Sequence, residues 1–188
     1  MEQMNQAYKV FTRICLNNWH YIDRKVLGLN ESINFFTGHS GSGKSTVIDA
    51  MQIVLYANTD GRGFFNKAAA DDSDRSLIEY LRGMINIGEN NQAEYKRNKN
   101  FSTTIVLEME QTITKEKECI GVVFDVETAT NEINRLFFWH KGELIPGDYR
   151  TKSRAMTISE VRSYLQQNFP KDEMFYTSNN ERFRRNLY

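Results

Sequence analysis

Gly38-His39-Ser40-Gly41-Ser42-Gly43-Lys44-Ser45-Thr46 fits the pattern G-x-x-x-x-G-K-[ST], the signature of a phosphate-binding P-loop. The glycines let the backbone curl so that successive N–H groups point inward at phosphate oxygens. Lys44 would place its charge against the β- and γ-phosphates of ATP, and the Ser45 hydroxyl would ligate Mg²⁺. We therefore predict that Gly38 to Thr46 bind the nucleotide, with Lys44 as the catalytic residue, Ser45 as the metal ligand and His39 as a backbone donor.

The segments on either side of this motif provide the context that a P-loop needs. Residues 32–37 are rich in aromatic and β-branched side chains and predict a strand. Residues 45–56 contain no Gly or Pro and are apolar almost all round, which predicts a buried helix. The N-terminus of that helix would present unpaired N–H groups and a partial positive charge to the same phosphates.

Upstream, residues 8–16 and 21–27 predict two strands that pair antiparallel before the P-loop strand. Downstream, a helix is predicted to start in the acidic stretch at residues 71–74 and to run through residues 76–82, with Gly83 as its C-cap. A polar loop over residues 88–100 follows it. We take residues 8–83 as the P-loop core.

The pattern then changes to three apolar strands with short polar connections, at residues 101–110, 118–126 and 134–140. They predict an antiparallel meander within residues 101–145. Capping-box spacing at Thr157 and again at Ser178 predicts two helices within residues 158–188. We therefore expect a single α/β domain over residues 1–188, a P-loop NTPase fold of the ABC or SMC half-head type with a mixed sheet and a β meander.

The composition of the 188-residue chain is that of a globular protein, with a formal net charge of zero. From Arg135 onward ten Lys and Arg face six Asp and Glu, a local excess of +4. Arg182, Arg184 and Arg185 are therefore either contacts to DNA or charges on the solvated face of a helix. Cys15 and Cys119 lie in apolar runs and predict small buried side chains rather than a zinc site. No signal peptide or stretch of transmembrane length is visible, so we expect a cytoplasmic protein without a membrane partner.

The strand Ile120-Gly121-Val122-Val123-Phe124-Asp125 resembles a Walker B strand, in which the terminal acid holds Mg²⁺. Its place in the predicted meander argues against that role, and Val126 follows where a second acid would stand. We expect Asp125 to be a solvated residue at the end of a sheet strand. An LSGG-type signature is also missing, so the chain has the phosphate-binding part of an ATPase and we expect it to be inactive alone.

Together these features resemble the N-terminal half-head of SMC-like ATPases, including the Rad50, SbcC and MukB relatives. The resemblance rests on Asn18-Trp19, on the P-loop, and on Ile48-Asp49-Ala50 in the helix that follows. Residues 65–70 and Tyr80-Leu81-Arg82-Gly83 are most similar to the JetC (MksB/EptC-type) subunit of Wadjet plasmid-defence systems. The resemblance to the SMC-like half-head covers nearly the whole chain.

The resemblance implies a divided ATPase in which a coiled coil separates this half from a C-terminal half that carries the signature and Walker B motifs. It implies as partners that C-terminal half, a second head, a kleisin-like subunit and DNA. The full-length protein would hydrolyse ATP and act in plasmid defence or chromosome organisation.

Some positions depart from the pattern of this family. Related heads often have a basic residue and Ser after Asn-Phe, whereas His20 follows Trp19 here, so His20 is either a nucleotide contact or a surface histidine. The segment 175–179 lacks the glutamine expected of a Q-loop. Arg75 and Arg82 are either arginines that reach nucleotide or DNA, or charges on a helix face.

Other classes of protein remain open. A self-contained P-loop kinase or other NTPase could use Arg62, Arg75 and Arg82 as lid residues. An ABC transporter subunit would share the P-loop but would need the missing signature. A binding module that does not hydrolyse nucleotide is the fourth alternative.

Overall fold

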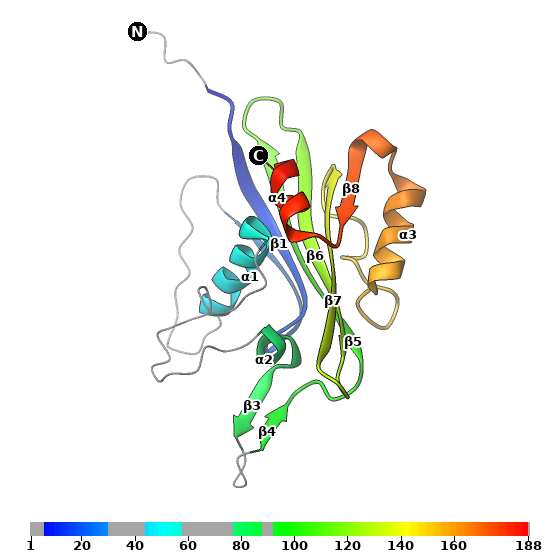
Figure 1. The fold of residues 1–188 in the computed structure, drawn as a ribbon. Helices are drawn as coiled ribbons and strands as arrows, with labels where there is room; N and C mark the ends of the chain where they lie inside the picture. The colour runs from blue at the N-terminus through cyan, green and yellow to red at the C-terminus, as the bar shows by residue number, and fades with distance from the viewer. Residues whose placement is uncertain (1–5, 30–43, 58–76, 88–91, 188) are drawn as a thin grey trace.

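A β-sheet runs through the computed structural model and carries helices on both of its faces (Figure 1). The structure describes residues 6–29, 44–57, 77–87 and 92–187, and within them six strands pair in the order β2-β1-β5-β6-β7-β8. The strands of this sheet are β1 (Lys9–Trp19), β2 (Ile22–Gly28), β5 (Phe101–Gln111), β6 (Lys117–Glu127), β7 (Glu132–Lys141) and β8 (Met174–Thr177).

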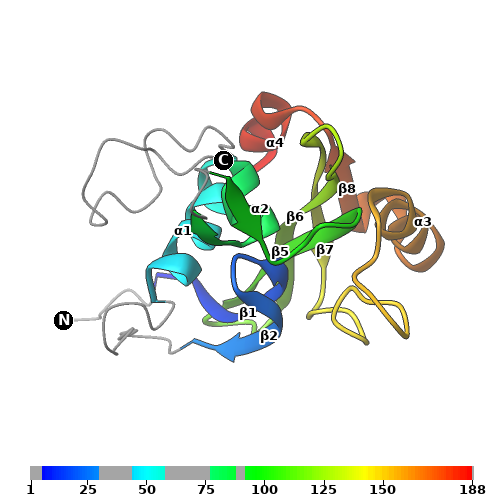
Figure 2. The same cartoon turned by 90° about the horizontal axis from the view of Figure 1, so that it is seen from below.

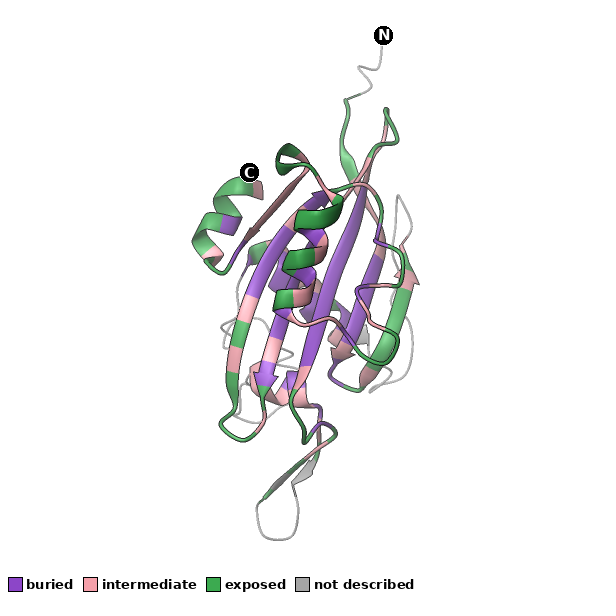
Figure 3. Ribbon diagram, turned by 90° about the vertical axis from the view of Figure 1, so that its right-hand side faces the viewer, coloured by how far each residue is buried: buried purple, intermediate pink, exposed green. Residues whose placement is uncertain are grey.

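The three central strands confirm the predicted meander. β5, β6 and β7 pair antiparallel in sequence order, with Val106 opposite Gly121 and Gly121 opposite Phe138. Most residues along β5 and β6 are buried, because helices or loops cover both faces of the sheet (Figure 3). Apolar residues at consecutive positions, rather than strict alternation, are what such two-sided burial requires.

β1 connects the P-loop side of the chain to the meander. It pairs with β2 on one edge and with β5 on the other, so the two predicted parts share a continuous sheet. Every strand pair among the described residues is antiparallel. The mixed sheet predicted from sequence depends on the strand at residues 32–37, which lies outside the described residues.

The helices divide between the two faces of the sheet (Figure 2). α1 (Lys44–Tyr56), α2 (Leu77–Arg82) and α4 (Asn180–Leu187) lie on one face, and α3 (Ile158–Asn168) lies on the other. We call the packing under the first three the α1-side core. Its buried side chains include Val47, Ala50, Ile53 and Val54 of α1, Ile105 and Leu107 of β5, Val122 and Phe124 of β6, and Phe183 of α4.

The α3-side core lies between α3, the segment 144–156 and the opposite face of the sheet. Tyr149 is fully buried there, and its hydroxyl lies 2.6 Å from Nε2 of His140. Cys15 and Cys119 are free thiols buried in the same core, as the sequence predicted. Burial raises the pKa of the Cys15 thiol to about 12, so it is an uncharged packing residue at neutral pH.

Gly121 is required where β6 passes under Phe138. A Cβ at this position would lie 2.6 Å from Cζ of Phe138 and 2.8 Å from the carbonyl oxygen of Ile105. Neither neighbour has room to withdraw in a packed sheet, so the absence of a side chain at Gly121 leaves the space that the Phe138 ring occupies.

The helix ends agree with the sequence in three of four cases. Thr157 caps α3 with the predicted capping box, and Gly83 ends α2 with φ +66°. α1 begins within one residue of its predicted start. α4 differs: Asn179 rather than Ser178 is its cap, because the Arg182 N–H donates to Oδ1 of Asn179 at 2.9 Å.

The predicted polar loop at residues 88–100 is wrong for its described part. Ala93–Tyr95 form β4, which pairs with β3 (Met84–Ile87), and Arg97 is buried. β8 and the short 3₁₀ turn η2 (Lys171–Glu173) were also not predicted. Strands of three or four residues carry too few side chains for a period to show in the sequence.

Candidate functional site

α1 begins at Lys44, so the last three residues of the P-loop motif, Lys44 to Thr46, form the start of this helix. Gly38, His39, Ser40, Gly41, Ser42 and Gly43 lie outside the described residues, as do the side chains of Lys44 and Ser45. The structure therefore establishes the helix into which the motif leads, and the predicted contacts to nucleotide and Mg²⁺ stay predictions. Among the described residues no group of three or more His, Cys, Asp and Glu is placed to hold a metal ion.

The first turns of α1 are held by two hydrogen bonds from outside the helix. Nε1 of Trp19, the last residue of β1, donates to the carbonyl oxygen of Thr46 at 2.8 Å. The hydroxyl of Tyr80, in α2, donates to Oδ2 of Asp49 at 2.8 Å. Thr46 and Asp49 are three residues apart and so lie on the same face of the helix.

Trp19 and Tyr80 also pack against each other. Their rings are stacked with centroids 5.2 Å apart and planes 17° from parallel, and both side chains are at most 2 % exposed. The apolar residues of α1 that follow, Val47, Ala50, Ile53 and Val54, are buried on the sheet beside this pair. The helix after the P-loop is thus fixed by polar contacts near its start and by apolar packing along its length.

His20 lies at the same corner of the molecule. It is 4 % exposed, its backbone N–H donates to the carbonyl oxygen of Tyr80 at 2.8 Å, and its φ is 51°. Its ring stacks on Tyr21 with centroids 3.8 Å apart. The structure therefore places His20 next to the residue that contacts α1, and its role as a nucleotide contact stays a prediction.

Asp125 has a structural partner set. Its Oδ1 accepts from the Ser102 hydroxyl at 2.7 Å and from the Ile158 N–H at 3.1 Å. The carboxylate thus satisfies the first turn of α3, on the face of the sheet opposite α1. The expectation that Asp125 is no Walker B acid agrees with this geometry, but the side chain is half-buried and hydrogen-bonded rather than solvated.

Arg82 is likewise used within the fold. Its Nη1 donates to Oδ1 of Asn131 at 2.8 Å and its Nη2 to Oδ1 of Asn98 at 3.2 Å. Its guanidinium also lies 4.1 Å from the ring centroid of Tyr95. Arg82 therefore ties α2 to the segment before β5 and to the turn between β6 and β7, while Arg62 and Arg75 lie outside the described residues.

Arg97 is a functional candidate that sequence reasoning missed. Its Nη1 donates to the carbonyl oxygens of His20 at 2.7 Å and Leu81 at 2.9 Å, and its Nη2 donates to that of Ile22 at 2.9 Å. Burial lowers the pKa of Arg97 to about 10, and nearby Asp23 opposes that shift, so the side chain stays charged at neutral pH. Its polar sequence neighbours gave no sign that it would be buried.

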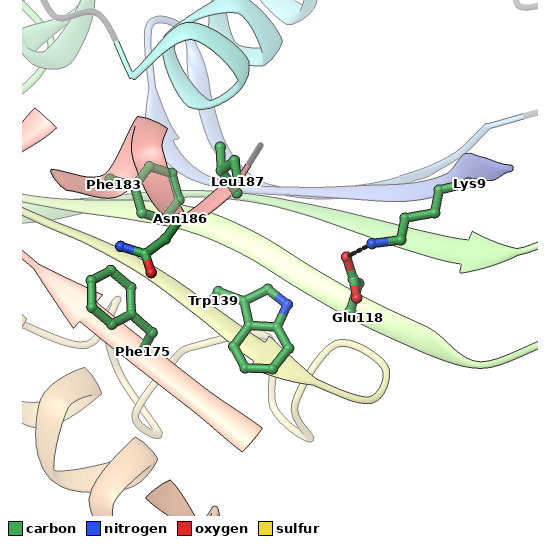
Figure 4. A pocket seen from close by; sticks show the side chains of 7 residues that line it. All are labelled: Lys9, Glu118, Trp139, Phe175, Phe183, Asn186 and Leu187. Carbon is green, nitrogen blue, oxygen red and sulfur yellow. Dashed lines mark hydrogen bonds and ion pairs between the residues drawn. The ribbon is translucent and has the colours of Figure 1, made fainter. Parts of the chain in front are cut away.

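A separate hollow of about 320 Å³ lies between α4 and strands β7 and β8, near the start of β1 (Figure 4). Trp139 and Phe175 face it from the sheet, and Lys9 and Glu118 form an ion pair of 2.7 Å beside it. Among the described residues that line it, none belongs to α1.

Comparison with known families finds a match over the segment that contains the P-loop motif and α1. Residues 11–72 match the model of a family described as the P-loop containing region of AAA domain. The chain therefore carries a P-loop region of the nucleotide-binding type. The match covers the motif itself, α1, Trp19 and His20, and it does not reach the meander.

No curated protein matches the chain. None of the described helices is both long and apolar enough to cross a membrane.

Proposed function

We propose that this chain binds ATP with Mg²⁺ and supplies the P-loop half of an SMC-like ATPase head. The proposal rests on the observation that α1 starts at Lys44, inside the motif and within the matched P-loop region. Backbone N–H groups of residues 38–46 would hold the phosphates, with Lys44 supplying a positive charge and Ser45 a ligand to Mg²⁺.

The two hydrogen bonds that hold the start of α1 are consistent with phosphate binding at its N-terminus. A helix whose first two turns are held by hydrogen bonds from two neighbouring elements presents its N-terminal N–H groups in a fixed direction, which phosphate binding requires. Bound ATP would bring the γ-phosphoryl group to be transferred, and Mg²⁺ would offset its charge.

A titration calorimeter tests nucleotide binding directly. We expect Lys44→Ala to weaken ATP–Mg²⁺ binding at least tenfold, as for the loss of a charge-assisted hydrogen bond of about 2 kcal/mol. Lys171→Ala, an exposed lysine in η2, is the control and should bind like the unchanged chain. Equal affinities for the chain and Lys44→Ala would contradict the proposal.

The half-head part of the proposal concerns hydrolysis. We infer that the signature and Walker B motifs come from a C-terminal half and a second head, and that the complete protein acts on DNA with a kleisin-like subunit. The position of Asp125 at the cap of α3 supports this, because it removes the acid in this chain that most resembles a Walker B residue.

Phosphate release measured for the chain alone, and for the chain mixed with its C-terminal half, separates the alternatives. We expect turnover only in the mixture, and none in the mixture that carries Lys44→Ala. Turnover by the chain alone at an ordinary enzyme rate would favour the self-contained kinase or NTPase instead.

A further inference from the structure

We propose that Tyr80 and Trp19 are positioning residues for the P-loop, which act by fixing the rotation and height of α1. The inference rests on the proposed function, since it assigns a purpose to contacts at the helix that follows the motif. It concerns residues that touch α1 rather than nucleotide.

The choice of side chains argues for positioning over simple stability. Asp49 is 3 % exposed, and its carboxylate accepts a hydrogen bond from the Tyr80 hydroxyl. Burying a carboxylate costs free energy that an apolar residue at this position would not. A buried polar link is directional, however, so it selects a single rotation of the helix where apolar packing tolerates several.

The two contacts together leave the helix little freedom. Trp19 binds the backbone at Thr46, which resists sliding along the helix axis, and Tyr80 binds the side chain of Asp49, which resists rotation. A shift by one residue would move the helix about 1.5 Å and turn it by about 100°. Binding groups need to be held to within about 0.5 Å, so such a shift would misplace the phosphate donors.

The residues that hold Trp19 and Tyr80 are themselves locked. Arg97 bridges the carbonyl oxygens of His20 and Leu81, which are the residues that follow Trp19 and Tyr80 in sequence. Gly83 closes the same corner, because a Cβ there would lie 2.7 Å from the carbonyl oxygen of His20. The turn after β1 and the end of α2 therefore form a rigid support on which the two contacts to α1 are mounted.

The test compares two buried tyrosines that lose the same atom. Tyr80→Phe removes the hydroxyl bonded to Asp49, and Tyr149→Phe removes the hydroxyl bonded to His140 on the opposite face of the sheet. We expect Tyr80→Phe to weaken ATP–Mg²⁺ binding on the order of tenfold, as for a lost hydrogen bond to a charged group. Binding of pyrophosphate–Mg²⁺ should weaken by the same factor, because the variant disturbs the groups that hold the phosphates.

Tyr149→Phe should lower the melting temperature by about as much as Tyr80→Phe does. It should leave the affinities for ATP–Mg²⁺ and for pyrophosphate–Mg²⁺ within about twofold of those of the unchanged chain. Trp19→Phe replaces the indole by a smaller aromatic ring that has no donor to Thr46, and serves as the second variant if Tyr80→Phe does not fold. It should show the same loss of affinity.

Amide hydrogen exchange without nucleotide gives a readout that does not depend on binding. Tyr80→Phe should speed exchange in residues 44–50 and leave β6 unchanged. The inference is overturned if the two tyrosine variants bind alike or exchange in residues 44–50 is unaltered. If Lys44→Ala weakens binding while Tyr80→Phe does not, this inference fails and the proposed function stands; if Lys44→Ala binds normally, the proposed function fails.

Discussion

Glu108, in the middle of β5, is a carboxylate with no exposed surface that is fully paired. Its Oε2 accepts from Nη2 of Arg13 at 2.6 Å and from the Leu144 N–H at 2.9 Å, and its Oε1 accepts from the Thr12 hydroxyl at 2.7 Å. Burial alone would raise its pKa, but these hydrogen bonds outweigh burial and lower the pKa of Glu108 to about 2.

The lowered pKa predicts how stability depends on acid. The pKa is about 2 in the folded chain and about 4.3 when unfolded, so the stabilisation from Glu108 is complete above the unfolded value. It is lost as the pH falls from about 4.3 towards 2. Urea unfolding at pH 7, 4 and 3 should show this loss.

Glu108→Gln should destabilise the chain by about 3 kcal/mol at pH 7 and remove that acid-dependent part. Exposed Glu116→Gln should behave like the unchanged chain. If the free energy of unfolding falls equally with pH in Glu108→Gln and in the unchanged chain, Glu108 is not the source of the acid dependence.

At the scale of elements, Gly121 tests how tightly β6 is packed under Phe138. We expect Gly121→Ala to destabilise the chain by about 2 kcal/mol, because the methyl group would meet the ring and a backbone oxygen. Gly28→Ala is the matched control, since nothing lies within 4 Å of a Cβ there and its effect should stay within about 0.5 kcal/mol. Equal unfolding free energies for the two variants would show that the strand can move aside.

The first turn of α3 tests the role of Asp125. Asp125→Ala removes the acceptor of the Ser102 hydroxyl and the Ile158 N–H, and should cost about 1–2 kcal/mol of stability. Its affinity for ATP–Mg²⁺ should not change, and neither should that of Glu127→Ala, an exposed acid at the end of the same strand. A loss of Mg²⁺-dependent binding with unchanged stability would restore Asp125 as a metal ligand.

The elements that could be predicted from sequence are those with a strong period or a clear cap. β5, β6 and β7 follow from long apolar runs, and α3 follows from the capping box at Thr157. The β3–β4 hairpin and β8 could not be found, because each strand spans at most four residues.

The contacts that hold α1 were also beyond sequence reasoning. Trp19 and Thr46 are close only because β1 turns back at His20, and Tyr80 reaches Asp49 only because α2 lies across the end of β1. Arg97 donates to three backbone carbonyl oxygens. Every residue has such an oxygen, so the sequence does not indicate which ones Arg97 will contact. Partners set by long-range folding have no fixed spacing along the chain.

Across the whole molecule, the sheet separates two hydrophobic cores that differ in role. The α3-side core holds buried side chains such as Tyr149 and His140 that serve packing, while the α1-side core holds the helix that follows the P-loop. β1 joins the two, because Cys15 faces the α3-side core and Trp19 ends the strand at α1. Nucleotide bound at residues 38–46 should therefore slow amide hydrogen exchange in β1 and α2 more than in α3.

Amide hydrogen exchange with and without ATP–Mg²⁺ tests most directly that nucleotide binds where the P-loop enters α1. We predict added protection in peptides that cover residues 38–50, with smaller protection around Trp19 and Tyr80, and no change in α3. Lys44→Ala should abolish all of it. Protection that appears instead around Trp139 and Phe175, or no protection in residues 38–50 at saturating ATP–Mg²⁺, would show that nucleotide does not bind at the start of α1.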